Sequence, residues 1–252
     1  MSRAKIRRDG FVCARLALIA AMMAPRNPLC VALDTPDVAK ARALARMLKA
    51  HAGYLKLGLE FYYATGAAGY EAVAAEGLPI FLDLKLHDIP NTVAQGLKSL
   101  MRLDPKPAIV NVHAQGGAAM LRAAREAVGD QAKLIAVTIL TSLTDDDCRE
   151  TGHDLGAEAL ALRLARFAHR EGLDGVVCSP NDLKALRAEL PPPFLAVTPG
   201  IRPKGADAHD QKRVATPKAA LAAGADILVI GRAITGAKDP AAACRAILAG
   251  PG

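Results

Sequence analysis

The chain has 252 residues, of which 52% are hydrophobic and 4% aromatic, and its formal net charge is +7. This length suits one domain with a single large core. The scarcity of aromatic residues argues against the base-stacking surfaces of nucleic-acid-binding proteins, and no apolar run reaches the roughly 18–20 residues that span a bilayer. We therefore expect neither nucleic acid nor a membrane as a partner.

The positive charge is concentrated at the start of the chain. Residues 1–22 carry a net charge of +4, which leaves +3 for the rest. A basic start followed by LALIAAMMA resembles a short signal peptide, but Arg15 interrupts the run upstream and no A-x-A cleavage pattern follows. We interpret residues 1–24 as an extension, with Met22 or Met23 as the natural start, and residues 25–252 as the folded domain.

Eight short apolar runs rich in β-branched residues follow along the chain. They are PLCVALD (28–34), GYLKLG (53–58), PIFLDLK (79–85), AIVNVHA (108–114), LIAVTIL (134–140), GVVCS (175–179), FLAVTPG (194–200) and DILVIGR (226–232). Their hydrophobicity is nearly continuous, as in strands that are buried on both faces. We therefore predict eight strands of a parallel sheet.

Helical patterns lie between these runs. Apolar residues at helical spacing predict helices in segments 38–51, 92–103, 118–128 and 157–172, and further helices are expected at 181–189, 217–223 and 240–248. A single α/β domain of the (β/α)8 barrel type typically has about 250 residues. The rival is an open, doubly wound sheet, which usually has a glycine-rich loop after its first strand. Here the first strand ends in LDTPD, so we predict the barrel.

The five cysteines are scattered, and they form no CxxC pattern or Cys/His cluster. This predicts neither a disulfide framework nor a zinc site, and it favours a reducing cytoplasm. Cys30 and Cys178 fall inside predicted strands, where we expect them to be buried as small hydrophobic side chains.

Polar residues gather at the ends of the predicted strands, where barrel active sites are built. Asp83 and Lys85 are two residues apart on one strand, so we expect their side chains to point to the same face. Lys56 ends the neighbouring strand, and Asp88 follows shortly after Lys85. The alternating charges fit a catalytic array, but a structural cluster of ion pairs would satisfy the same pattern.

The loops after the seventh and eighth strands favour the catalytic interpretation. They read TPGIRPKGADAHDQ and VIGRAITG, and such loops often bind phosphate in barrels of this type. Arg202 and Arg232 have the planar, forked donors that suit phosphate, and Gly231 allows close approach of the backbone. The loop at 203–206 is a candidate lid.

Five segments, DLKLHDIPNT, VNVHAQGG, ILTS, TPGIRP and VIGR, resemble the signature segments of the orotidine 5′-phosphate decarboxylase family, bacterial type. The resemblance implies a carboxy-lyase that converts orotidine 5′-monophosphate to UMP and carbon dioxide, without a metal or an organic cofactor, in a homodimer of barrels. Residues 25–252 would then be the catalytic domain.

The resemblance also implies roles for individual residues. Lys85 matches the proton donor to C6 of the pyrimidine, Asp83 the aspartate beside the substrate carboxylate, and Lys56 the outer lysine of the array. Asp88 and Thr92 match residues that reach into the neighbouring subunit's site. The other matches are substrate contacts: Asp34 for the ribose, Thr141 for the pyrimidine, and Pro199, Arg202, Gln211, Gly231 and Arg232 for the base and phosphate. His87 and His113 are interpreted as structural.

The nearest alternative is a Mg²⁺-dependent sugar-phosphate decarboxylase or aldolase on the same barrel, of the 3-keto-gulonate-6-phosphate type. Such an enzyme needs additional carboxylate ligands near the strand ends. The DIPNT and PGIRP segments argue against it. A phosphate-binding scaffold that has lost its chemistry would show a broken charge array, whereas all four members are present here.

Overall fold

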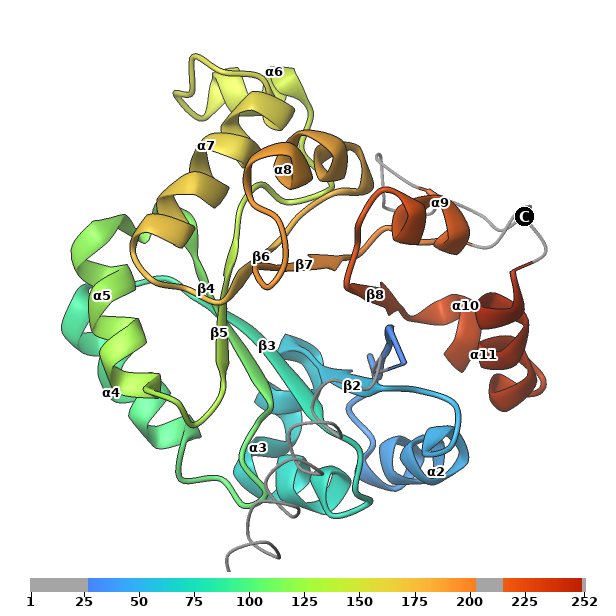
Figure 1. Cartoon of the computed structure of the whole chain (residues 1–252). Coiled ribbons are helices and arrows are strands. Elements are labelled where there is room, and N and C mark those ends of the chain that lie inside the picture. Colours follow the sequence, from blue (N-terminus) through green and yellow to red (C-terminus); the bar gives the residue numbers. More distant parts are fainter. Residues whose placement is uncertain (1–26, 203–214, 251–252) are drawn as a thin grey trace, which may run out of the picture.

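The computed structural model describes residues 27–202 and 215–250, and its strands form one closed barrel (Figure 1). Each strand pairs in parallel with the next along the chain, and the last pairs with the first, which closes the ring. The strands are β1 (Leu29–Ala32), β2 (Tyr54–Leu57), β3 (Ile80–Leu86), β4 (Ile109–His113), β5 (Lys133–Val137), β6 (Gly175–Val177), β7 (Leu195–Thr198) and β8 (Ile227–Ile230). The predicted (β/α)8 barrel is confirmed.

Helices form the outer layer around the strands (Figure 1). Those that match the predicted segments are α2 (Val38–Leu48), α4 (Pro90–Leu100), α5 (Gly117–Val128), α7 (Ala157–Arg170), α8 (Leu183–Glu189), α9 (Pro217–Ala222) and α11 (Pro240–Ala249). Several of these helices are preceded by an N-cap residue whose side chain accepts a hydrogen bond from an otherwise unpaired backbone N–H of the first turn. Asp37, Thr216 and Asp239 each accept a hydrogen bond from the first turn of their helix, and proline follows the last two.

Helix α3 (Leu59–Ala74) lies between β2 and β3, where the sequence shows no clear helical periodicity. Its sequence, LEFYYATGAAGYEAVA, is apolar on most sides. The helix is also broken at Gly66, whose φ of +62° is in the region that glycine tolerates best. The break at Gly66 divides the helix into two pieces, so the apolar residues do not follow one continuous helical period. This explains why the sequence pattern does not predict α3.

The structure also adds the short elements α6 (Asp145–Glu150), α10 (Arg232–Thr235) and η1 (Ala114–Gly116). The helix predicted at 181–189 consists of a short 3-10 turn, η2 (Pro180–Asp182), followed by α8.

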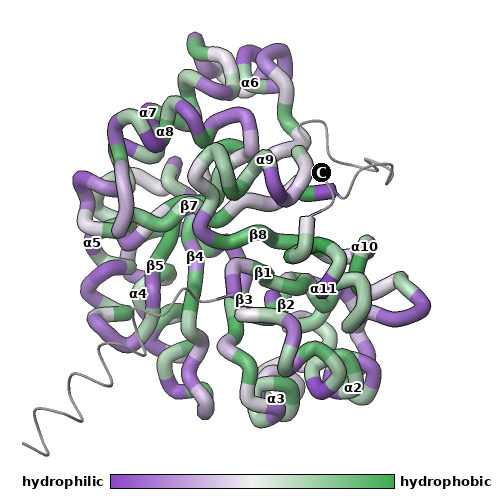
Figure 2. Tube along the Cα trace, turned by 45° about the vertical axis from the view of Figure 1, so that its right-hand side comes forward, coloured by the Kyte–Doolittle hydropathy of each residue, from purple (hydrophilic) through white to green (hydrophobic). Residues whose placement is uncertain are grey.

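The strands are buried on both faces. In β1, Leu29 and Val31 belong to the core between strands and helices, whereas Cys30 and Ala32 belong to a second cluster with residues of other strands, which includes Phe81. This alternation follows from the two-residue period of a strand and identifies the second cluster as the barrel interior. Figure 2 accordingly shows β1, β5 and β8 as largely hydrophobic. The prediction that Cys30 and Cys178 are buried is confirmed.

Ion pairs stabilise the end of the barrel where the strands begin. Asp174 precedes β6, accepts a hydrogen bond from the backbone N–H of Leu134 at 2.8 Å and pairs with Arg125 at 2.6 Å. Asp226 precedes β8, accepts from the N–H of Ala196 at 2.7 Å and pairs with Arg187. Each carboxylate therefore links the start of one strand to the neighbouring strand, at the face that contributes stability in such barrels.

No helix in the described ranges is long and apolar enough to cross a membrane.

Candidate active site

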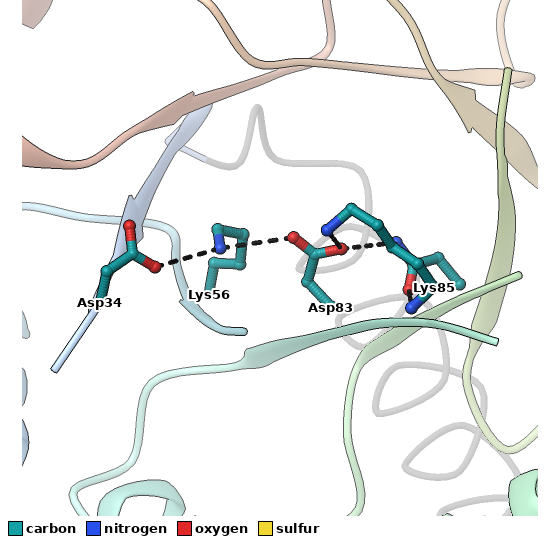
Figure 3. Close-up of polar contacts among 5 residues, drawn as sticks. Asp34, Lys56, Asp83 and Lys85 are labelled. Carbon is teal, nitrogen blue, oxygen red and sulfur yellow. Dashed lines mark hydrogen bonds and ion pairs between the residues drawn. The ribbon is translucent and has the colours of Figure 1, made fainter. Parts of the chain in front are cut away.

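Four charged side chains form a continuous chain of contacts at the ends of the first three strands (Figure 3). Lys56 Nζ lies 3.4 Å from Asp34 Oδ1 and 3.3 Å from Asp83 Oδ2. Lys85 Nζ lies 2.7 Å from Asp83 Oδ1. Asp34, Lys56, Asp83 and Lys85 are called the charge array below. The structure joins Lys56, Asp83 and Lys85, as expected from the sequence. The fourth member is Asp34, whereas the sequence had suggested Asp88, which lies outside these contacts within its own chain.

The centre of the charge array is buried and fully charged. Only 10% of the Asp83 side chain and 13% of the Lys56 side chain are exposed. Burial raises the pKa of Asp83, but Lys56 and Lys85 outweigh it, and the net pKa is lower than usual. Burial likewise lowers the pKa of Lys56, but Asp83 and Asp34 outweigh it, and the net pKa is higher than usual. Each ion is therefore held in its charged form by its partners.

The backbone at Lys85 departs from a regular strand. Its φ is +52°, the only positive φ of a non-glycine residue in the described part of the chain. Such a conformation costs on the order of 1–3 kcal/mol and is often found at functional sites. The pairing of β3 with β4 also shifts register between Leu82 and Leu86. The side chains of Asp83 and Lys85 do converge as expected, but a bulge, not simple strand alternation, brings them together.

A cavity of about 310 Å³ opens above the charge array, which is the size expected of a small-molecule site. All four members of the array line it. It is also lined by the predicted substrate contacts Thr141, Pro199, Arg202, Gly231 and Arg232. Residues from β1, β2 and β3 and from the loops after β5, β7 and β8 thus meet around one cavity.

Gly231 lies at the lining of this cavity, next to Ala32 and Asp34. A Cβ atom placed there would lie 3.5 Å from Asp34 Oδ2 and 3.5 Å from Ala32 Cβ. A larger side chain would therefore project toward the charge array and reduce the space next to Arg232.

Two predicted site residues lie elsewhere on the same chain. Asp88 and Thr92 are exposed and do not line the cavity. Asp88 is in the connection between β3 and α4, where its carboxylate accepts a hydrogen bond from the N–H of Ile89 at 2.6 Å. Gln211 and the candidate lid at 203–206 lie outside the described residues, as does the extension at 1–24.

The two histidines near the site contact each other. The rings of His87 and His113 are stacked, with centroids 5.4 Å apart. Burial, together with the nearby charges of His87 and Lys85, lowers the pKa of His113, although Asp83 opposes this. Neither ring lines the cavity, and a structural role for both histidines remains a prediction.

Across residues 27–202 and 215–250, no three His, Cys, Asp or Glu side chains are grouped so that they could hold a metal ion.

Asn111 is the contact of the charge array that the sequence analysis missed. It lies in the middle of β4 with no exposed surface, and its Nδ2 donates to Asp83 Oδ1 at 2.7 Å. The signal was present in VNVHA, because an asparagine within a buried apolar run needs polar partners. The sequence alone does not tell which partners these are.

Asparagine in place of Asp83 is expected to lower the free energy of unfolding by about 3–5 kcal/mol at neutral pH, because the buried Lys56 and the partly buried Lys85 lose their shared carboxylate. The pKa of Asp83 is depressed in the folded state. Its contribution is therefore full above the unfolded-state pKa of about 4 and is lost as the pH falls through the lower, folded value. Urea unfolding of both proteins between about pH 7 and pH 3 measures the difference, which should shrink in acid. Asp130→Asn, at an exposed turn, is the control, and a difference that stays constant with pH contradicts the prediction.

Comparison with known proteins places the chain among related sequences and structures. Residues 27–247 match the model of the Orotidine 5'-phosphate decarboxylase / HUMPS family. The chain is 52% identical to the orotidine 5'-phosphate decarboxylase of Rhodospirillum rubrum over 231 residues, which cover 88% of this chain and 93% of that protein. It is also 52% identical to that of Novosphingobium aromaticivorans over 221 residues, with coverage of 88% and 97%.

A solved structure shows the same arrangement. The crystal structure of orotidine 5'-phosphate decarboxylase from Lactobacillus acidophilus superimposes with a TM-score of 0.77 at 39% identity, and covers 88% of this chain and 98% of that one. The family match spans all eight strands and every described residue that lines the cavity. The chain therefore belongs to the Orotidine 5'-phosphate decarboxylase / HUMPS family.

Proposed function

We propose that this protein decarboxylates orotidine 5′-monophosphate to UMP and carbon dioxide, the last step of de novo pyrimidine synthesis. The observation that carries the proposal is the charge array of Asp34, Lys56, Asp83 and Lys85 around a cavity that two arginines also line. The relatives that share about half of the sequence bear the name of this activity. A biosynthetic enzyme with free, buried thiols in its described part suits the cytoplasm, which is the location we propose.

The array supplies what this decarboxylation needs. When the bond between C6 and the carboxylate breaks, its electron pair stays on C6, and an ammonium group at that position stabilises the developing charge and then donates a proton. Lys85 is the side chain suited to this role, since it lines the cavity and is 29% exposed at the end of the array. After the transfer, the neutral amine takes up a proton from solvent, which restores the starting state.

Asp83 contributes in two ways to the proposed reaction. Its carboxylate pairs with Lys85 at 2.7 Å and so holds the ammonium group in place beside the cavity. Its carboxylate also faces the cavity, where it would lie next to the substrate carboxylate and repel it until carbon dioxide leaves. Ground-state repulsion of this kind is a recognised but contested source of catalysis, so the first role carries more weight in the proposal.

Arg202 and Arg232 are proposed to bind the phosphate. Both line the cavity beyond β7 and β8, and a guanidinium group matches phosphate with paired hydrogen bonds. Binding energy from a phosphate distant from C6 can be used to hold the reacting carbon against Lys85. Thr141 and Pro199 line the same cavity and are proposed to contact the pyrimidine, and Asp34 the ribose.

The proposed active form is a homodimer in which Asp88 and Thr92 complete the site of the neighbouring subunit. Their exposure, and their absence from the cavity lining of their own chain, support this assignment. Ile89 lies between them with 66% of its surface exposed, which suits a segment that packs against a second subunit.

The proposal is tested by following the loss of absorbance of orotidine 5′-monophosphate with EDTA present. Turnover that survives EDTA supports the proposed reaction and rules against the Mg²⁺-dependent alternative. Absence of turnover by the folded protein, with or without Mg²⁺, overturns the proposal.

Alanine in place of Arg232 is expected to weaken UMP binding by about 10- to 100-fold, because a hydrogen bond to a charged group contributes about 1.5–3 kcal/mol. The loss should be confined to ligands that carry the phosphate, so uridine should bind both proteins equally. Titration calorimetry with UMP and uridine measures both effects. Arg245→Ala, on the exposed side of α11, is the matched control. An unchanged UMP affinity contradicts the role of Arg232.

A further inference from the structure

The side chain of Asn111 connects the two central members of the charge array. Its Oδ1 accepts a hydrogen bond from the backbone N–H of Lys85 at 2.8 Å, and its Nδ2 donates to Asp83 Oδ1 at 2.7 Å. A backbone N–H can only donate and a carboxylate only accepts, so these two partners fix the orientation of the amide. With the contact of Lys85 Nζ to Asp83 Oδ1 at 2.7 Å, the three residues form a closed ring.

The hydrogen bond from the Lys85 N–H to Asn111 Oδ1 takes the place of a backbone hydrogen bond of a regular strand pair. Leu82 pairs with Val110 and Leu86 with Val112, so three residues of β3 face Asn111 alone. The bulge removes the N–H of Lys85 from the regular ladder and gives this residue its φ of +52°. The amide oxygen of Asn111 satisfies that N–H and so stabilises an unfavourable conformation.

Asn111 is well suited to hold other groups in place. It lies in β4, which pairs with β5 in register over five consecutive residues from Ile109 to His113. Its side chain has no exposed surface and does not line the cavity. It therefore acts from a regular, buried strand on the irregular end of β3, without contact with the substrate.

We propose that Asn111 is a positioning residue for the decarboxylation: it holds the bulged backbone of Lys85 and the carboxylate of Asp83 so that the Lys85 ammonium meets C6. The inference rests on the proposed function, since it assigns Asn111 to the same reaction. A misplacement of about 1 Å at a reacting group can cost about 100-fold in rate, which sets the expected size of the effect.

The first test replaces Asn111 by leucine, which has a similar volume but neither a donor nor an acceptor. We expect kcat to fall by about 100-fold, while the KM and the affinity for UMP change little because no cavity contact is lost. Asn181→Leu, at an exposed asparagine of η2, is the control and should behave as the wild type.

The second test replaces Asn111 by aspartate, which keeps the shape and the acceptor for the Lys85 N–H but loses the donor to Asp83. Protonation of the new carboxyl restores a donor, so the ratio of its kcat to that of the wild type should rise as the pH is lowered. Of the charged residues, Asp83 and Lys85 contact Asn111, and Lys56 pairs with the other oxygen of Asp83. The titratable His113 lies two residues along the same strand. The lysines favour the ionised carboxylate, whereas Asp83 and burial favour the protonated form.

A change in this ratio with pH separates positioning from packing, because loss of packing alone has no reason to follow the protonation of residue 111. The inference is overturned if kcat is unaffected, if kcat and UMP affinity fall in parallel, or if the ratio is constant with pH. If Asn111→Leu does not fold, Asn111→Asp decides alone. Each of these outcomes requires an active wild-type enzyme, whereas an inactive wild type counts against the proposed function itself.

Discussion

Replacing Lys85 by alanine is expected to lower kcat by about four orders of magnitude or more, because both the proton donor and its charge at C6 are lost. The fold should persist. Asp83 retains Lys56 Nζ at 3.3 Å and Asn111 Nδ2 at 2.7 Å, so its carboxylate keeps two partners in the variant. Arg202 and Arg232, which also line the cavity, are unchanged, and UMP should still bind.

Single-turnover and steady-state assays of Lys85→Ala, together with UMP titration and thermal unfolding, separate these effects. Lys184→Ala, an exposed lysine on α8, is the matched control and should retain full activity. Substantial turnover by a folded Lys85→Ala protein would remove Lys85 from the role of proton donor.

Mixing Lys85→Ala with Asp88→Ala subunits is expected to restore activity that neither variant has alone. If each site combines Lys85 of one subunit with Asp88 of the other, a heterodimer contains one site with both residues intact and one site that lacks both. Random exchange of equal amounts gives heterodimers as half of all dimers, so about a quarter of the wild-type activity should return.

The matched control mixes Lys85→Ala with Asp83→Ala. These two residues contact each other within one chain at 2.7 Å, so every site of that heterodimer lacks one of them and no activity should return. Differently tagged subunits confirm that heterodimers form. Confirmed heterodimers without restored activity in the first mixture would show that Asp88 does not act across the interface.

The strands and most helices could be predicted because their signals are local. Eight apolar runs in the sequence correspond one to one with β1 to β8, and the segment predicted as helical from residue 38 contains α2. Helix α3 was missed because its apolar surface and the break at Gly66 remove the helical period. Periodicity predicts an element only where one continuous face is buried.

Three members of the charge array could also be predicted from the sequence, because parallel strands in a barrel direct their carboxyl ends to one mouth. The fourth, Asp34, took the place expected for Asp88. Lys56, Asp83 and Lys85 were placed there by their positions at strand ends, and the structure joins them. Gly231 and the two arginines were expected at the same mouth, and they line the cavity.

The geometry at Lys85 was decided only by the tertiary structure. A strand read alone predicts that Asp83 and Lys85 share a face by simple alternation, whereas the pairing with β4 produces a bulge and a positive φ at Lys85. Asn111 became part of the site because it is the residue opposite that bulge. The sequence by itself determined the barrel and which charges stand at its mouth, since both follow from local patterns. The register between neighbouring strands determined how Lys85 is held, because a buried N–H displaced from its ladder must find another acceptor, and only the folded chain shows which one.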